Sequence, residues 1–121
     1  MEKQYKILDK QIVYDGFFQM EKYRLQHTLF NGGWSQPISR ELFERGHAVA
    51  VLLYDPHEDA VVMVEQFRIG ALQHADHPWF IEIVAGMVEE GESEKEVALR
   101  ESVEEAGCEV KRMEFIARYW V

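Results

Sequence analysis

A short segment in the last third of the chain joins a glycine to a helix with closely spaced carboxylates. The segment runs from Gly86 to Cys108. Ser93, with Glu96 three residues later, has the pattern of a helix N-cap with a capping box, and Gly107 stands where a helix would end. The pattern predicts a helix over residues 94–106, preceded by a glycine turn.

The carboxylates of this helix are expected to gather on one face. At 100° per residue, Glu101 and Glu105 lie about 40° apart around the axis, and Glu104 lies about 60° to the other side of Glu101. The apolar positions that point away are expected to pack on a core: Leu99, Val103 and Ala106. Carboxylates this close repel one another unless a cation lies between them, which is the pattern of a divalent-metal site for phosphate chemistry. An arbitrary cluster of three glutamates is nevertheless more often a solvated acidic face, and that alternative stays open at this point.

Charge and composition limit the partners and the compartment. The net charge is -9, and residues 86–109 hold nine glutamates against Lys95 and Arg100. This balance argues against a nucleic-acid backbone as partner. One cysteine, Cys108, excludes an internal disulfide and is typical of a reducing cytoplasm. The longest apolar run, residues 48–54, is too short to span a membrane, and the N-terminus lacks signal-peptide character, so we expect a cytoplasmic protein.

Outside the acidic segment, apolar residues mostly recur at every second position, which predicts strands. A hairpin is expected around residues 31–33, and a strand is expected to deliver Ala85 and Gly86 to the turn before the helix. The expected strands cover residues 23–29, 34–42, 48–54, 60–66, 79–84 and 109–121, with a polar turn at 55–59. A boundary near Gly46 divides an antiparallel section, residues 1–45, from a mixed sheet and helix section, residues 46–121.

The acidic segment resembles the Nudix box, Gx5Ex7REUxEExGU with U an aliphatic residue, over its full length. The fixed positions are occupied by Gly86, Glu92, Arg100, Glu101, Glu104, Glu105 and Gly107. Ser102 and Cys108 stand where aliphatic residues are usual, and both are small, so a small loss of packing is expected. The resemblance implies an α+β fold, the Nudix α/β/α sandwich with a mixed sheet, and hydrolysis of a nucleoside diphosphate linked to another moiety.

The resemblance also implies a metal centre. In Nudix enzymes the ligands are carboxylates matching Glu101 and Glu105 and a main-chain carbonyl matching Ala85, with Glu104 as a weaker candidate. Magnesium suits these hard oxygen donors, and Mn²⁺ is the alternative cation. Arg100 is interpreted as a residue that orients the glutamates by charge-assisted hydrogen bonds. Glu92 is interpreted as a support for the loop and the helix start.

Four further segments resemble the ADP-ribose pyrophosphatase branch of the family, namely residues 15–18, 40–47, 65–68 and 83–86. The resemblance covers residues 12 to 108. In that branch the N-terminal strands are exchanged between two subunits, which implies a homodimer here. The positions that match substrate contacts are Phe17, Phe18, Arg40, Glu41 and Arg68. A phenylalanine ring can stack on adenine, and an arginine can bind phosphate or ribose oxygens, although two phenylalanines in an arbitrary chain are more often core residues.

The implied function is Mg²⁺-dependent hydrolysis of ADP-ribose to AMP and ribose 5-phosphate. Two alternatives stay open: a non-catalytic nucleotide-binding or scaffold protein of Nudix form, and a pyrophosphatase for another nucleotide sugar. In related pyrophosphatases the box helix is followed by further strands and by a loop that supplies the general base. Because the sequence stops at Val121, we expect a fragment with its general base beyond Val121, and an impaired 121-residue form. The alternatives are that another chain supplies the further strands or that the protein does not catalyse.

Overall fold

The computed structural model of the chain describes residues 2–73 and 76–121. The chain divides into two compact units, Met1–Gly46 and His47–Val121, called unit 1 and unit 2 below. Unit 1 is built of strands alone, and unit 2 combines strands with the single α-helix of the described residues. The predicted α+β class is therefore confirmed.

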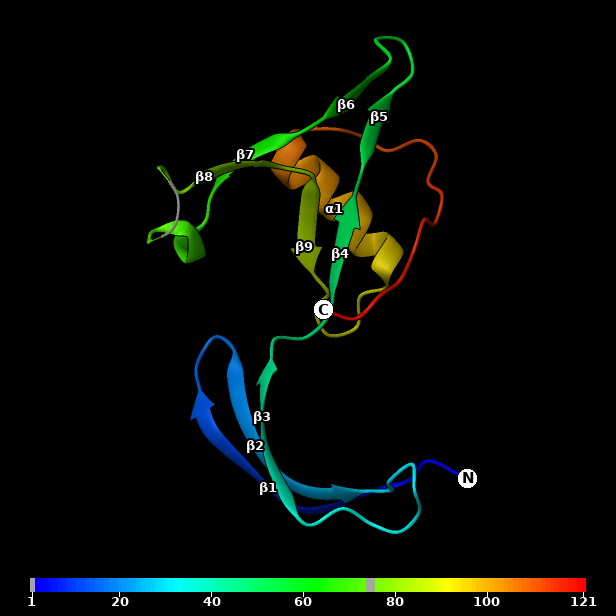
Figure 1. The fold of residues 1–121 in the computed structure, drawn as a ribbon. Helices are drawn as coiled ribbons and strands as arrows, with labels where there is room; N and C mark the ends of the chain where they lie inside the picture. Colours follow the sequence, from blue (N-terminus) through cyan, green and yellow to red (C-terminus); the bar gives the residue numbers. More distant parts are fainter. Residues whose placement is uncertain (1, 74–75) are drawn as a thin grey trace. The chain divides into compact units, whose positions relative to one another are not determined.

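Unit 1 is a three-stranded antiparallel sheet (Figure 1). Its strands are β1 (Tyr5–Asp15), β2 (Gln19–His27) and β3 (Ile38–Glu44), in the order β1-β2-β3. The hairpin predicted around residues 31–33 is confirmed, since β2 pairs with β3 and a bridge joins Thr28 to Trp34. Gly32 and Gly33 have φ angles of 91° and 79°, in the left-handed region that glycine tolerates. The long strand β1 is an addition to the predicted set.

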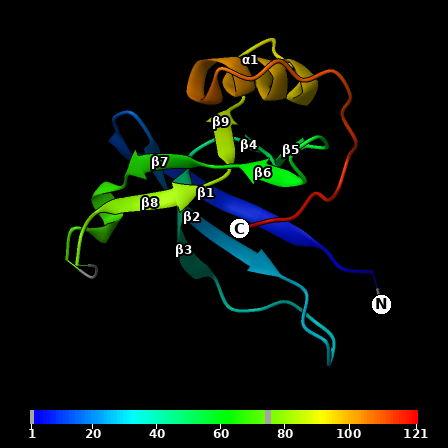
Figure 2. The same ribbon diagram turned by 90° about the horizontal axis from the view of Figure 1, so that it is seen from above.

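Unit 2 contains three antiparallel strand pairs and one helix. The strands are β4 (Ala48–Val51), β5 (Leu53–Asp55), β6 (Ala60–Val62), β7 (Val64–Phe67), β8 (Trp79–Glu82) and β9 (Val84–Met87), followed by α1 (Glu94–Ala106), with a short 3-10 helix η1 (Ile69–Ala71) after β7. β4 pairs with β9, β5 with β6, and β7 with β8. Helix α1 packs on β9 and β4 (Figures 1 and 2).

The helix matches its prediction from cap to cap. The Ser93 hydroxyl accepts a hydrogen bond from the Glu96 backbone N–H, and the Glu96 carboxylate accepts one from the Ser93 backbone N–H, which is the reciprocal capping box. Gly107 ends the helix with a φ of 64°. The predicted packing face was wrong for two of its three residues, because Leu99 and Val103 are 36% and 53% exposed, whereas Ala106 is half-buried. The residues that α1 buries are Val97, Ala98 and Ser102.

Several strand predictions need correction. The strand expected to be buried over residues 48–54 is interrupted at Leu52, and Leu53 is its one buried residue. Ala85 and Gly86 lie within β9 and not in a turn, and residues 109–121 form no strand. All strand pairs of the described residues are antiparallel, so the expected mixed sheet is absent from that part of the chain.

The segment after α1 is extended and irregular. In Figure 1 it runs back along the helix, and Arg118 hydrogen-bonds Glu94 in the first helical turn at 2.6 and 2.8 Å. Among residues 2–73 and 76–121 no helix is long and apolar enough to cross a membrane.

Candidate metal centre

Strand β9 and helix α1 bring a glycine directly beneath a carboxylate. A Cβ atom built on Gly86 would lie 2.0 Å from Oε1 and 2.1 Å from Cδ of Glu101. No side chain fits in that space while Glu101 keeps its position. The glycine of the acidic segment is therefore required by close approach and not by a turn, which corrects the reason for which it was singled out.

The main chain of Ala85 faces the second carboxylate. Its N–H donates to Oε2 of Glu105 at 3.2 Å. Val88 donates to the carbonyl of His47 at 2.9 Å, so in the register of β4 and β9 the pair of Ala85 with Ala50 is a non-hydrogen-bonded one. In such a pair both the N–H and the C=O point away from the partner strand. The Ala85 carbonyl thus lies on the strand edge that faces Glu105.

Arg100 organises the carboxylates at the other side of the site. Its Nε and Nη2 bind Glu92 at 2.8 and 2.9 Å, and its Nη1 binds Glu101 at 2.7 Å and Glu104 at 3.3 Å. Its Nη2 also lies 3.4 Å from the carbonyl oxygen of Met87. The Arg100 guanidinium holds the pKa of the Glu92 carboxyl below its ordinary value, and Glu92 in turn raises the pKa of Arg100. These contacts agree with the orienting role inferred from the sequence.

Arg68 is linked to the second candidate ligand, Glu105, through the side-chain amide of Gln66. Arg68 binds Glu82 through Nε at 2.9 and 3.1 Å, and its Nη2 donates to Oε1 of Gln66 at 2.6 Å. The Gln66 amide donates to Oε1 of Glu105 at 2.5 Å. The Arg68 guanidinium lowers the pKa of Glu82, and Glu82 raises the pKa of Arg68. Sequence reasoning assigned no role to Gln66 or Glu82, although Gln66 lies within the segment 65–68 that carries the resemblance and Glu82 directly precedes the segment 83–86.

The donor set fits a magnesium ion. Within residues 2–73 and 76–121, no three or more His, Cys, Asp or Glu side chains converge as a ready metal site. Magnesium does not need three such groups, because it commonly takes one or two carboxylates and keeps several waters. Glu101 and Glu105 on one helix face, with the Ala85 carbonyl opposite, are hard oxygen donors of the kind that Mg²⁺ selects.

The remaining substrate candidates lie in unit 1. Phe17 and Phe18 lie in the bend between β1 and β2, where their rings stack edge to face with centroids 4.7 Å apart. Phe17 is 87% exposed. Phe18 also contacts Phe43 at 5.1 Å. Arg40 and Glu41 are exposed on β3, and Arg40 donates to the carbonyl of Ser39 at 2.8 Å. The structure thus divides the five candidates, with four in unit 1 and Arg68 in unit 2 beside the carboxylates.

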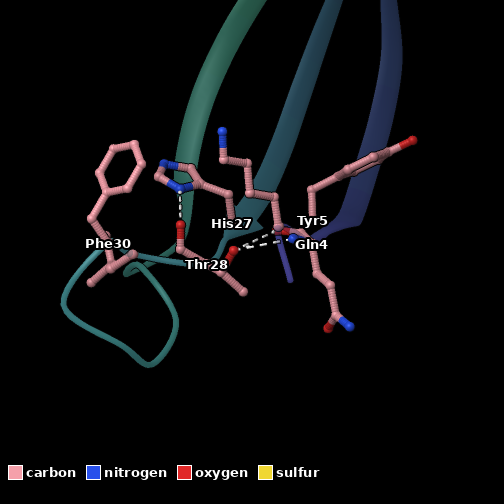
Figure 3. Close-up of a pocket in the computed structure, with 7 residues that line it drawn as sticks. Gln4, Tyr5, His27, Thr28 and Phe30 are labelled. Atoms are coloured by element: carbon pink, nitrogen blue, oxygen red, sulfur yellow. Dashed lines mark hydrogen bonds between the residues drawn. The ribbon is translucent and has the colours of Figure 1, made fainter. Parts of the chain in front are cut away.

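Unit 1 also has a hollow at the end of its sheet that involves none of these candidates. Figure 3 shows its lining, with His27 turned to the carbonyl of Thr28 and Thr28 bonded to the backbone of Gln4. Its walls are formed by Lys3, Gln4, Tyr5, His27, Thr28, Leu29 and Phe30. The hydrogen bonds drawn there join Thr28 to the backbone of Gln4 and to the ring of His27, so they connect the residue before β1 to the end of β2.

The sequence of this chain is similar to those of known proteins. A family model described as NUDIX domain matches residues 44–120. An ADP-ribose pyrophosphatase of Escherichia coli (strain K12) is 52% identical over 106 residues, covering 88% of this chain and 51% of that protein. One of Haemophilus influenzae is 49% identical over 117 residues, covering 94% and 54%. A GDP-mannose pyrophosphatase of Klebsiella pneumoniae is 40% identical over 72 residues, covering 59% and 36%. The chain spans about half the length of the first two relatives.

Proposed function

This chain belongs to the Nudix family, and we propose that the protein hydrolyses the diphosphate of ADP-ribose to AMP and ribose 5-phosphate with Mg²⁺. The observation that carries the proposal is the pair of carboxylates on α1, Glu101 and Glu105, beside the main chain of Ala85 and Gly86. The names of the two relatives that are about half identical to this chain support ADP-ribose as substrate.

In this proposal Glu101, Glu105 and the Ala85 carbonyl hold Mg²⁺, with Mn²⁺ as a substitute. The bound cation would neutralise diphosphate charge and lower the pKa of a bound water. Arg100 keeps Glu101 turned toward the strand by binding it and Glu92 together. The expected general base beyond Val121 stays a prediction.

We further propose that the substrate is held by the side chains at the five candidate positions. The Phe17 and Phe18 rings supply a stacking surface for adenine, and Arg40 and Glu41 supply charged hydrogen-bonding groups. Arg68 supplies a guanidinium next to the carboxylates for phosphate or ribose oxygens.

The proposed assembly is a homodimer in the cytoplasm, in which the N-terminal strands, residues 1–45, are exchanged between subunits and residues 46–121 form part of the Nudix domain. Support comes from the sheet of unit 1, which exposes large apolar side chains of β1 such as Tyr5, Ile12 and Tyr14. A sheet with so much exposed apolar surface is expected to gain a partner.

A second candidate function is hydrolysis of GDP-mannose, which a 40% identical relative favours. The test is release of nucleoside monophosphate by the full-length polypeptide, with Mg²⁺, from equal concentrations of ADP-ribose, GDP-mannose and ATP. We expect AMP from ADP-ribose to form fastest. Faster release of GMP would transfer the assignment to GDP-mannose. Binding of ADP-ribose without turnover would favour the non-catalytic alternative.

A further inference from the structure

A continuous line of hydrogen bonds runs through unit 2 from β8 to the main chain of β9. Glu82 binds Arg68, Arg68 donates to Gln66, and Gln66 donates to Glu105. Glu105 then accepts the N–H of Ala85. In β7 and β8, Gln66 and Glu82 share one face because Gln66 pairs with Phe80 and Val64 pairs with Glu82. The line therefore links a candidate substrate residue to a candidate metal ligand through Gln66.

The amide of Gln66 is chemically matched to its two neighbours. Arg68 can only donate hydrogen bonds, so the atom facing it must be the carbonyl Oε1, and the ionised Glu105 can only accept, so the atom facing it must be the NH₂ group. The distances, 2.6 Å and 2.5 Å, fit charge-assisted bonds. A carboxylate at this position would repel Glu105, and an aliphatic side chain would leave both neighbours without the bond.

The contact fixes Glu105 without using up its capacity for a cation. Oε1 accepts from Gln66 and Oε2 accepts from Ala85, so both oxygens are held and the carboxylate cannot rotate freely. An ionised carboxylate has about four lone-pair sites, so about two stay available for a metal ion. A ligand held in this way does not need to be ordered when the cation binds, which favours tighter binding.

The other end of the line leaves part of Arg68 available. Its Nε and Nη2 serve Glu82 and Gln66, and within the described residues its Nη1 makes no hydrogen bond. The guanidinium plane is therefore fixed while one edge of it can donate to an oxygen of the substrate.

We propose that Gln66 is a positioning residue, which sets the orientation of Glu105 for a divalent cation and ties it to that of Arg68. This inference rests on the proposed function, because it takes Glu105 as a metal ligand. The residue acts through its neighbours and touches neither the cation nor the diphosphate.

The first test measures Mn²⁺ affinity of the full-length protein by the loss of the free-ion signal in electron paramagnetic resonance. Gln66→Leu and Gln66→Met both remove the two bonds and nearly keep the volume, so each serves if the other fails to fold. We expect either variant to weaken Mn²⁺ binding about tenfold. Glu65→Gln is the matched control, since Glu65 lies on the opposite face of β7, and its affinity should stay within about twofold of the parent protein.

The second test separates positioning from a general effect on the fold. In a Glu105→Gln background, Gln66→Met should produce no further loss of Mn²⁺ affinity, because its effect is transmitted by Glu105. The side-chain amide signals of Gln66 in nuclear magnetic resonance spectra should shift during a Mg²⁺ titration with the midpoint of metal binding. An unchanged Mn²⁺ affinity in Gln66→Leu and Gln66→Met, an equal loss in both backgrounds, or a parent protein that binds no Mn²⁺ would overturn the proposal.

These measurements need no substrate. A tenfold weaker Mn²⁺ affinity that depends on Glu105, in a protein that releases no AMP from ADP-ribose, would therefore support the positioning role and overturn the proposed function. An active enzyme whose Mn²⁺ affinity is unchanged by substitution of Gln66 would support the proposed function and overturn the positioning role.

Discussion

Two arginines of unit 2 each organise one of the two candidate metal ligands, and they do so in different ways. Arg100 binds Glu101 directly at 2.7 Å and anchors on Glu92, eight residues before it. Arg68 does not bind Glu105 directly, because the Gln66 amide lies between them. Gln66 and Glu105 are 39 residues apart in the sequence. The first arrangement lies within one contiguous segment of the chain. The second exists only after strand and helix have packed.

The contrast between the two arginines indicates which contacts can be predicted from a sequence motif. Residues on a helix and in the loop before it lie at set distances along the chain, so the contacts of Arg100 with Glu92 and Glu101 can be written as a spacing in the sequence. The contact from Gln66 depends on the register of β7 with β8 and on the packing of α1, neither of which has a fixed offset in the chain. We expect the direct arrangement to matter more for metal binding and the indirect one to join metal binding to substrate binding.

The largest effect on turnover and on Mg²⁺ binding is expected from substitution of the two carboxylates that the arginines orient. Glu101→Gln and Glu105→Gln keep the shape of the side chain but remove its charge, so each should lower turnover by about a hundredfold or more, with the fold intact. The measurement is AMP release from ADP-ribose, beside calorimetry of Mg²⁺ binding. The exposed Glu90 supplies the control, and Glu90→Gln should retain activity. Unchanged Mg²⁺ affinity in both ligand variants would remove the metal assignment.

The next effect concerns the space beneath Glu101. Gly86→Ala places a methyl group where the Glu101 carboxylate lies, 2.0 Å from Oε1, so the carboxylate must move away from the strand. We expect about a tenfold or greater loss of Mg²⁺ affinity. Gly70→Ala is the control, because a Cβ there meets no atom within 4 Å. Normal Mg²⁺ binding by Gly86→Ala would mean that the metal does not need Glu101 in this position.

Exchanging each arginine for lysine tests the comparison itself. Arg100→Lys loses the fork that binds Glu92 and Glu101 together, so Mg²⁺ affinity should fall about tenfold. Arg68→Lys should weaken Mg²⁺ binding less and should raise KM for ADP-ribose more. The paired measurement is calorimetry with Mg²⁺ and steady-state kinetics on both variants. If the two variants changed Mg²⁺ affinity and KM for ADP-ribose equally, the two arginines would not have distinct roles in metal and substrate binding.

The sequence predicted the parts of this site that depend on local rules. The helix over residues 94–106 follows from Ser93, Glu96 and Gly107, whose roles at helix ends are set by nearby backbone groups. The hairpin of unit 1 follows from its glycine turn in the same way. These features could be predicted because each requires only residues a few positions apart.

The errors concern long-range packing. Gly86 was assigned to a turn, yet it lies in β9. Glycine is needed there because the side chain of Glu101, fifteen residues later in α1, approaches the strand closely. Leu99 and Val103 were expected inside from periodicity, but the face that meets β9 and β4 buries Val97, Ala98 and Ser102. Ser102 fits there because its hydroxyl donates to the Ala98 carbonyl at 2.6 Å. Periodicity gives a face but not the partner that covers it.

A smaller effect is expected at the helix start, away from both arginines. Ser93→Ala removes the hydroxyl that accepts from the Glu96 backbone, and it should lower the free energy of unfolding by about 1 kcal/mol, measured by urea denaturation. Metal affinity should change little, since Ser93 contacts Glu96 and neither carboxylate ligand. Ser93→Thr keeps the hydroxyl and serves as the control. A large loss of Mg²⁺ affinity in Ser93→Ala would show that the site depends on the helix end.

The smallest effect is a pH dependence of stability from the two arginine pairs. Arg100 and Arg68 lower the pKa of Glu92 and of Glu82 below the ordinary value of 4.5. Each pair therefore stabilises the fold above that pH, and the contribution is lost as the pH falls through the lowered pKa of the folded state. The difference in unfolding free energy between the parent and Arg100→Gln should be constant from about pH 7 to pH 5 and should shrink in more acid solution. A difference that grows with acid would contradict the assignment.

The central claim, that the carboxylates of α1 and the main chain of β9 form a cation site, is tested most directly by crystallography with Mn²⁺. Anomalous scattering locates the ion without reference to activity. We expect an anomalous peak within direct coordination distance of Glu101, Glu105 and the Ala85 carbonyl, with Gln66 still bound to Glu105 and outside the coordination sphere. A peak elsewhere in the molecule, or none at a saturating Mn²⁺ concentration, would contradict it.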